Sequence, residues 1–447
     1  MLHVGEGRSR AITLAIMALA VVTAFALALP AWSSGGHSII RLLHWWLVTV
    51  DGDDSWKPMR AAYLWFKQGD GTPIYQHVFF QEHIKFQYPP SSLLIFALGE
   101  RLGFSTSNHA LNAIGWFGVP IVALATGAHA WLFTRDWPEL VLRLAATAIA
   151  AVAALTFYPV LWSYTQGQIQ LWFSAMFALA SLCWLFDRKR AAGALIGAIC
   201  FAKPQFLLFL VWTLWRRDWR FAGTMAVVLV LIFGASLAVF GWANHVDYLN
   251  ALSYMSHHGE AFIRNYTVNG VMNRLVGNGQ DLEFEPNAYA PYHPLVYWTT
   301  VLSSCVLIGL ALFRRRGGAP TLFDFYIVAL SLTLASPIAW EHHFGIMPVM
   351  FVVLALTLAK EKARWLSAAV LFLAFVSCDV FLPPIASLAY GPESMLQSPM
   401  FFGVVGVLIL LYRGSASLPP VSKPHEYALA IEGVAEQPAQ QGIGQRA

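Results

Sequence analysis

The run WRFAGTMAVVLVLIFGASLAVFGW, from Trp219 to Trp242, decides the fold class of this chain, because Arg220 is its single charged residue. A helix of about 20 apolar residues crosses a bilayer core roughly 30 Å thick. In that core every backbone polar group must be satisfied within the protein, so a long apolar run becomes a helix unless a closed barrel forms. Barrel strands are alternating segments of about 10 residues. This run therefore predicts a membrane-spanning helix.

The composition shows that the whole chain is apolar, like this run. Of its 447 residues, 57% are hydrophobic and 12% are charged, whereas soluble domains carry about 25% charged residues. The net charge of +4 is small, so nucleic acid is not an implied partner. The four cysteines lie in apolar runs without a CxxC pair, which fits core residues better than a redox or metal site. We therefore predict an all-α polytopic membrane protein.

About twelve apolar runs are long enough to be candidate spans. They lie near residues 11–32, 89–104, 109–133, 139–160, 167–187, 191–215, 219–242, 293–313, 321–338, 343–359, 364–385 and 398–412. The first reads as a retained anchor, because no clear cleavage site follows it. Residues 1–412 are expected to form one membrane-embedded domain. Residues 413–447 are rich in Pro, Gly, Ser and Gln, which predicts a disordered cytoplasmic tail.

Lysine and arginine residues between the runs predict the orientation, because cytoplasmic loops carry the excess of these residues. On a twelve-helix count, residues 33–88 and 243–292 form two large outer loops. The basic segment 187–190 would then lie outside, against this bias. Re-entrant or half-length hairpins broken at Pro159 and Pro204 would remove the conflict. Both topologies keep the two large loops outside.

The first outer loop is expected to hold two helices at the membrane surface. The segment HSIIRLLHWWLVTV, residues 37–50, combines apolar and basic residues in an amphipathic pattern. A second helix is expected to begin with Asp54 as its N-cap. The loop ends at Tyr88, which the following Pro89 and Pro90 force out of helical geometry. Tyr88 would then mark the membrane interface.

The same loop places Asp51, Asp53 and Asp54 within four residues. A helix cap requires only one carboxylate. Three interpretations stay open: a general base whose pKa rises beside like charges, a divalent metal site, or cap and turn chemistry alone. We favour the general base, because the calcium-loop register lacks its Gly and Glu.

Positive and polar groups lie in other segments that the topology places near the outer side. His342 and His343 in SPIAWEHHFG are costly at a helix end, which suggests phosphate or hydroxyl binding, although interface anchoring is the alternative. Lys203 lies in the apolar segment FAKPQFLLF, where it either meets a lipid phosphate or snorkels. Further polar candidates for substrate binding are Gln168, Arg264, Asn269 and Arg60.

Taken in order, several segments resemble glycosyltransferase family 87, the C-fold membrane glycosyltransferases that include mycobacterial mannosyltransferases using polyprenyl-phosphate mannose. These segments are DDSWKPMRAAYLWFKQGDGTPIY, FQYPPSSLLIF, TQGQIQLWF, AGALIGAICFAKPQFLLFLVWTLWRRDWR, NGVMNR and SPIAWEHHF. The resemblance covers about residues 35–412. It implies a C-type fold with juxtamembrane helices in the first outer loop, a lipid-phosphate sugar donor, inversion at the anomeric carbon and no nucleotide-sugar site. The juxtamembrane helices would admit the lipid donor sideways.

The resemblance also implies roles for single residues. Asp54 matches the family's loop aspartate best, seven residues ahead of Ala61, and Asp53 matches second. The positions that match the family's donor-phosphate motifs are Tyr88, Lys203, Arg274 and His342, with His343 beside the last of them. The chain departs from the pattern at Lys57, Pro58 and Ala339, which weakens an assignment of the sugar.

Together these observations predict a glycosyltransferase of a plasma membrane whose site faces outward. It would move a hexose, with mannose as the expected sugar, from polyprenyl phosphate to a hydroxyl of a lipid or glycan acceptor, with no cofactor and no metal ligand. A transporter or flippase of a polyprenyl-linked glycan is the main alternative. That class predicts inverted repeats and ionisable residues in mid-span, and neither is evident. A noncatalytic scaffold would not require Asp54.

Overall fold

A computed structural model describes residues 2–33, 38–48, 51–314, 320–360, 365–380 and 391–417. Most of the tail predicted for 413–447 lies outside these residues, and the last described helix runs through Ser417. The described residues form helices and connecting segments, with no β-strand among them. The fold is therefore all-α, as the sequence predicts.

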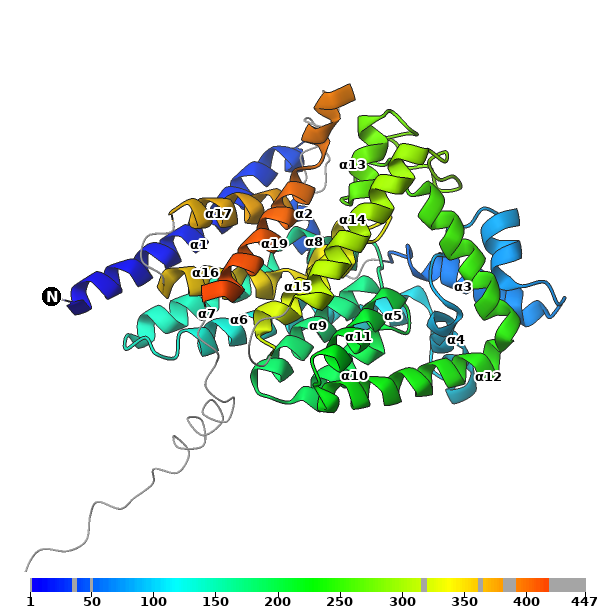
Figure 1. The fold of residues 1–447 in the computed structure, drawn as a ribbon, viewed down its shortest axis with the longest axis horizontal. Helices are drawn as coiled ribbons and strands as arrows, with labels where there is room; N and C mark the ends of the chain where they lie inside the picture. Colours follow the sequence, from blue (N-terminus) through cyan, green and yellow to red (C-terminus); the bar gives the residue numbers. More distant parts are fainter. Residues whose placement is uncertain are drawn as a thin grey trace, which may run out of the picture.

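The elements follow one another along the chain as a long series of mostly short helices (Figure 1). Their bounds are α1 Leu2–Ser33, α2 Ile39–Leu47, α3 Trp56–Gln68, π-helix η1 Tyr75–Gln81, η2 Pro90–Leu93, α4 Leu94–Leu102, α5 Asn108–Trp116, α6 Gly118–Phe133, α7 Leu140–Leu155, α8 Tyr158–Thr165, α9 Gln170–Leu185, α10 Lys189–Ile199, η3 Pro204–Leu207, α11 Leu208–Trp215, α12 Trp219–His258, α13 Val268–Leu275, α14 Pro294–Phe313, α15 Leu322–Leu334, η4 Glu341–Ile346, α16 Pro348–Lys360, α17 Trp365–Asp379, η5 Gly391–Gln397 and α19 Pro399–Ser417.

Every predicted apolar run contains helix, but few of the helices are long enough to span a bilayer alone. By length and composition, four candidates occur among the described residues: Ser9–Leu29, Asn108–Phe133, Trp219–His258 and Pro294–Phe313. A fifth arises if α7 and α8 form one bent span. These helices make the chain an integral membrane protein. The count of twelve spans stays a prediction.

Helices break near both prolines at which one of the two open topologies places a half-length hairpin. α7 and α8 meet at an angle of 41°, and Pro159 lies in the first turn of α8, where its missing N–H costs nothing. α10 ends at Ile199, and a non-helical segment through Lys203 leads into η3 at Pro204. The second break leaves Lys203 outside regular helix, facing the middle of the fold.

The long helix α12 bends at Gly241, whose φ of 74° is a left-handed conformation that glycine adopts without strain. The bend falls at the predicted end of the span. The helix then continues to His258, so the first part of the expected loop 243–292 is helical. In Figure 1 this second half of α12 rises beside the segments of the first loop, and it contacts η1 and η2.

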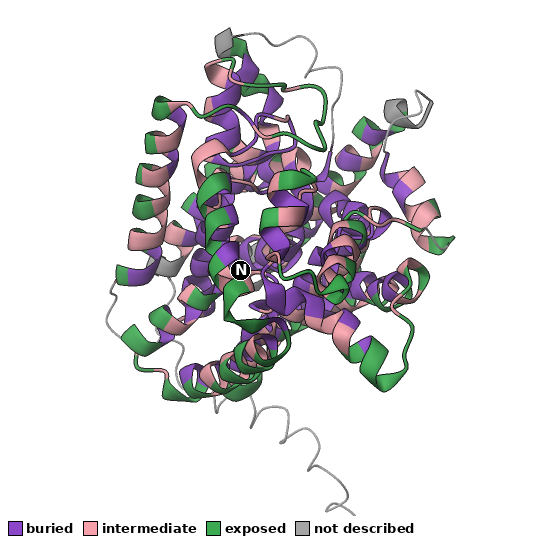
Figure 2. Cartoon of the chain, turned by 90° about the vertical axis from the view of Figure 1, so that its right-hand side faces the viewer, coloured by how far each residue is buried: buried purple, intermediate pink, exposed green. Residues whose placement is uncertain are grey.

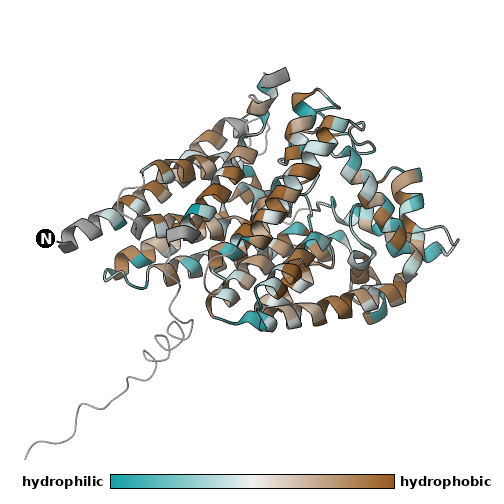
Figure 3. Ribbon diagram, viewed as in Figure 1, coloured by the Kyte–Doolittle hydropathy of each residue, from teal (hydrophilic) through white to brown (hydrophobic). Residues whose placement is uncertain are grey.

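Apolar side chains lie both inside the fold and on its outer helices. Buried residues concentrate in the interior, whereas the outer helices show exposed faces (Figure 2). On α12 and α14 these exposed faces are apolar and include Val230, Leu231, Leu302 and Val306 (Figure 3). An apolar face of this extent suits contact with lipid. α10 lies against α12 through Gly193, because a Cβ there would collide with the Phe221 carbonyl oxygen, which fits close helix packing.

Both helices expected in the first outer loop are present as α2 and α3. The predicted cap of the second is wrong. Ser55, and not Asp54, precedes α3, and its side chain makes no capping hydrogen bond. The Asp54 carboxylate instead accepts a hydrogen bond from the Gln168 side chain, so tertiary contacts take precedence over local capping.

Candidate active site

One cavity of about 460 Å³ collects side chains from distant parts of the chain. Its polar lining residues are Asp54, Lys85, Gln87, Tyr88, Gln168, Lys203, Gln205, Glu260, Ser336, Trp340, His342 and His343. Its apolar wall includes Leu208 of α11, Leu252 of α12, Ile308 of α14 and Leu332 of α15. Polar groups on one side and lipid-like residues on another suit a ligand that has both characters.

Two glycines bring Asp54 to this cavity. The backbone at Gly52 passes so close to the turn after α8 that a Cβ there would lie 2.5 Å from the Thr165 carbonyl oxygen. Gly167, at φ +68°, meets Gly52 from the other side. The Asp54 amide donates to the Gln166 carbonyl oxygen at 2.9 Å. Glycine at both positions therefore lets the carboxylate loop lie directly on the turn that carries Gln168.

Ser55 fixes the orientation of the Gln168 amide. Its hydroxyl donates to Gln168 Oε1 at 2.7 Å and accepts a hydrogen bond from the Ile169 amide at 3.1 Å. Tyr88 is the third partner of this hydroxyl, at 2.9 Å. With the amide oxygen held in this way, the Gln168 nitrogen must face the other direction, where it donates to Asp54 Oδ2.

The surroundings of Asp54 suit a proton acceptor. Its pKa is raised to about 6, chiefly by burial; the Gln168 hydrogen bond opposes this rise, and the charges of Asp53, Glu341 and Glu260 add to it. Many protein atoms surround the carboxylate, but the side chain is exposed where it borders the cavity, so water can reach it. A carboxylate with this pKa is mostly ionised at neutral pH and is still basic enough to take a proton.

Across the cavity, Lys203 lies beside His343. The Lys203 ammonium contacts His343 Nε2, and the Trp340 amide donates to His343 Nδ1 at 2.9 Å. Burial, and then the charge of Lys203, lowers the pKa of His342 well below the usual range. This wall therefore holds the Lys203 ammonium beside two imidazoles, of which His342 is uncharged at neutral pH.

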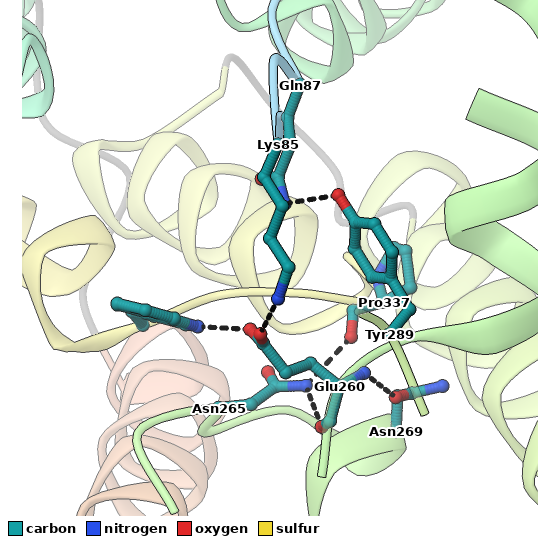
Figure 4. A network of polar contacts seen from close by, with 8 residues as sticks. Lys85, Gln87, Glu260, Asn265, Asn269, Tyr289 and Pro337 are labelled. Atoms are coloured by element: carbon teal, nitrogen blue, oxygen red, sulfur yellow. Dashed lines mark hydrogen bonds and ion pairs between the residues drawn. The ribbon is translucent and has the colours of Figure 1, made fainter. Parts of the chain in front are cut away.

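A second polar network closes the cavity at one end (Figure 4). The Lys85 ammonium lies 2.7 Å from Glu260 Oε1, and Trp340 Nε1 donates to Glu260 Oε2 at 2.7 Å. Gln87 donates to the Tyr289 hydroxyl at 3.0 Å. Sequence reasoning missed Lys85, Gln87 and Glu260. The only available signal was a charged residue three positions before Tyr88 in a loop that re-enters the membrane.

The structure brings six predicted site residues to the cavity: Asp54, Tyr88, Gln168, Lys203, His342 and His343. The other five, Asp53, Arg60, Arg264, Asn269 and Arg274, are not among its lining residues.

Four of the five residues away from the cavity make side-chain hydrogen bonds within the protein. Arg60 donates to the Thr106 carbonyl oxygen and the Asn108 side chain. Arg274 donates to three backbone carbonyls and to the Ser398 hydroxyl. These contacts tie loops together, so the structure gives both arginines a supporting role rather than a place at the cavity.

The other two residues, Arg264 and Asn269, contact residues that lie in or next to the cavity lining. Arg264 pairs with the buried Glu341, which directly precedes His342. Asn269 accepts from the Glu260 amide at 3.1 Å (Figure 4). Arg264 therefore acts on His342 through Glu341, whereas Asn269 holds the backbone of the cavity residue Glu260 directly. Among the residues described here, no group of three or more His, Cys, Asp or Glu side chains is placed to hold a metal ion.

Comparison with known proteins places this arrangement in a family. The sequence model of glycosyltransferase family 87 matches residues 86–337. A polyprenol-phosphate-mannose-dependent alpha-(1-2)-phosphatidylinositol mannoside mannosyltransferase of Mycolicibacterium smegmatis is 26% identical over 324 residues, which are 67% of this chain and 69% of that protein. The protein of the same name from Mycobacterium tuberculosis is 26% identical over 351 residues, which are 73% of each chain. No solved structure gives a significant match.

Proposed function

The chain belongs to glycosyltransferase family 87, and from that premise we propose that it moves mannose from polyprenyl-phosphate mannose to a hydroxyl of a lipid or glycan acceptor. The curated relatives carry the name of such mannosyltransferases. The observation that carries the proposal is one cavity with a basic carboxylate at Asp54, a Lys203–His343 pair and an apolar wall. The acceptor hydroxyl matches the carboxylate, and the phosphate and isoprenoid chain of the donor match the Lys203–His343 pair and the apolar wall.

Lys203, His342 and His343, with Tyr88 beside them, are proposed to bind the donor phosphate. An anion beside the Lys203 ammonium favours the charged form of the lysine. Its charge then faces the phosphate oxygen that gains an electron pair when the sugar leaves.

The isoprenoid chain is proposed to lie against the apolar wall formed by α11, α12, α14 and α15. This path for the lipid differs from the entry past the amphipathic helices of the first loop that the sequence predicts. The first loop contributes a single apolar residue, Pro58, to the cavity lining. Membrane helices on both sides of the wall would keep the chain in lipid while the phosphate reaches Lys203.

Asp54 is proposed to be the general base. The acceptor hydroxyl gives its proton to Asp54 while its oxygen forms a bond to C1 of the sugar. The bond from C1 to the phosphate oxygen breaks, and its electron pair leaves with polyprenyl phosphate. Gln168 holds Asp54 Oδ2, which leaves Oδ1 for the acceptor.

A single displacement of this kind inverts the anomeric carbon. A retaining double displacement would use a second carboxylate as a nucleophile. The other lining carboxylate, Glu260, has both oxygens engaged, by Lys85 and by Trp340. This arrangement supports inversion.

The test compares Asp54→Asn with Asp53→Asn in purified protein supplied with polyprenyl-phosphate mannose and a phosphatidylinositol mannoside acceptor. Asp54→Asn should lower the transfer rate by about 10²-fold or more, the lower end of general-base contributions. Asp53, which does not line the cavity, should tolerate the same change within about threefold. Near-normal transfer by Asp54→Asn would reject the base, and no transfer by wild-type protein would reject the donor.

We propose further that the cavity faces outward from a bacterial plasma membrane, within about twelve spans of a C-type fold. The positions of the basic loops support this orientation. Cysteine placed at Asp51 should react with a membrane-impermeant maleimide in intact cells. Reaction only after the membrane is permeabilised would put the site on the cytoplasmic side.

A further inference from the structure

A second cavity, of about 420 Å³, lies beside the first. Its walls come from Glu260–Phe262 and from the loop after α13, including Gly279, Gln280, Glu283, Glu285 and Ala288–Pro291. Its volume falls within the roughly 300–1,000 Å³ of small-molecule sites. No residue that lines this second cavity takes part in the proposed transfer step.

Glu260 lines both cavities and, with Lys85 and Trp340, forms the partition between them. Its two carboxylate oxygens are taken by those two partners (Figure 4). Phe284 lines the first cavity, and its ring lies 5.6 Å from that of Phe262 in the second. The charge of Glu260 also contributes to the raised pKa of Asp54. The two cavities therefore share the Glu260 side chain as a wall.

The two cavities differ in charge. The first is lined by Lys85, Lys203 and two histidines, besides the carboxylates of Asp54 and Glu260. The residues lining the second carry three carboxylates, of Glu260, Glu283 and Glu285, and include no lysine, arginine or histidine. Glu260 is paired with Lys85, so an anionic ligand such as a phosphate would meet the negative charge of Glu283 and Glu285 there. Sugar hydroxyls, in contrast, donate hydrogen bonds that carboxylates accept strongly.

The shape and chemistry of the second cavity fit a neutral ring. Glu283, Glu285 and Gln280 are exposed at its mouth, where they can accept hydrogen bonds from hydroxyls. Phe262 and Tyr289 supply aromatic surface for the apolar face of a sugar. The apolar lining of the first cavity has no counterpart of similar extent here, so a lipid chain has less to contact.

We infer that the second cavity binds a neutral, hydroxyl-rich ring of the acceptor, next to the ring whose hydroxyl reaches Asp54. The inference rests on the proposed function for the identity of the acceptor. It assigns phosphate to one cavity and neutral sugar to the other. An acceptor that carries a chain of sugars is then bound through two of its rings, one in each cavity. Glu283 and Glu285 become determinants of acceptor specificity.

Direct binding tests the inference without turnover. The probe is α-mannobiose, titrated into purified wild-type protein and into Glu283→Gln/Glu285→Gln, with binding followed by saturation-transfer NMR. The neutral amides keep the shape and remove the charge, so the Kd should rise about tenfold, as expected when charge-assisted bonds become ordinary ones. Glu82→Gln, an exposed glutamate outside the cavity, should bind as wild type does. Mannose 6-phosphate should compete poorly with the probe.

The outcomes separate this inference from the proposed function. If the wild-type protein transfers mannose but the double variant keeps its Kd and its acceptor KM, the second cavity is not the subsite. If mannobiose binding falls in the variant although wild-type protein transfers nothing from polyprenyl-phosphate mannose, the subsite stands and the donor assignment fails. Competition by mannose 6-phosphate as strong as by mannose would overturn the argument from charge. The thermal midpoint of each variant checks that it is folded.

Discussion

Replacing Gln168 by leucine removes the one side-chain hydrogen bond that holds the pKa of Asp54 down. A hydrogen bond to a charged group contributes about 1.5–3 kcal/mol. Asp54 borders a cavity open to water, so the lower end of that range applies. About 1.4 kcal/mol corresponds to one pKa unit, and the pKa of Asp54, about 6 in the native site, should therefore rise by about one.

The sign of the effect follows from the role of a base. Asp54 must be ionised to accept a proton, so activity falls as the pH drops through its pKa. The acidic limb of the kcat/KM profile should lie near pH 6 for wild-type protein. In Gln168→Leu it should lie about one pH unit higher. The donor phosphate diester keeps its single charge across this range, so it does not contribute to the shift.

The assay measures initial transfer rates from pH 5 to pH 9 at low concentrations of both substrates. Gln68→Leu, at the exposed end of α3, is the matched control and should leave the profile unchanged. Ser55→Ala should shift the acidic limb in the same direction by less, because the amide of Gln168 loses its fixed orientation. If folded Gln168→Leu shows the wild-type acidic limb, then Gln168 does not set the pKa of the base.

Two further predictions concern the donor phosphate. Lys203→Met should raise the donor KM by about 10-fold or more, the loss of one charge-assisted hydrogen bond, with the acceptor KM changed far less; equal donor KM values would assign Lys203 to snorkelling. EDTA should leave the transfer rate within about twofold, because Lys203 and the histidines are proposed to face the leaving phosphate; complete loss that Mg²⁺ restores would favour the metal interpretation of the aspartate cluster.

Several features of the fold could be predicted from the sequence because they depend on local physics. The amphipathic segment at 37–50 predicts α2, and the apolar run at 219–242 predicts the span that Gly241 ends. One of the two topologies that the sequence left open placed helix breaks at Pro159 and Pro204, where the structure has them. The cap of α3 could not be predicted, because Asp54 is a good cap by residue type and only the distant Gln168 turns it away.

The candidate site was predicted in part. The family motifs, taken in their order along the chain, pointed to Asp54, Tyr88, Lys203 and His342, all of which line one cavity. It also pointed to Arg274, whose guanidinium is instead engaged by backbone carbonyls and Ser398. A buried arginine and a ligand-binding arginine look the same in a sequence, because the difference lies in which acceptors the fold brings within hydrogen-bond distance.

By itself, the sequence determined that this chain lies in a membrane as helices, since apolar runs leave the backbone no other way to satisfy its hydrogen bonds there. It also determined which residue types were available for proton transfer and for phosphate. Only the tertiary structure decided which of them share a cavity. Residues 54, 168, 203 and 343 come together through close backbone approaches at Gly52 and Gly167 and a helix break before Pro204. Such approaches depend on the packing of segments far apart in the chain, which no local pattern encodes.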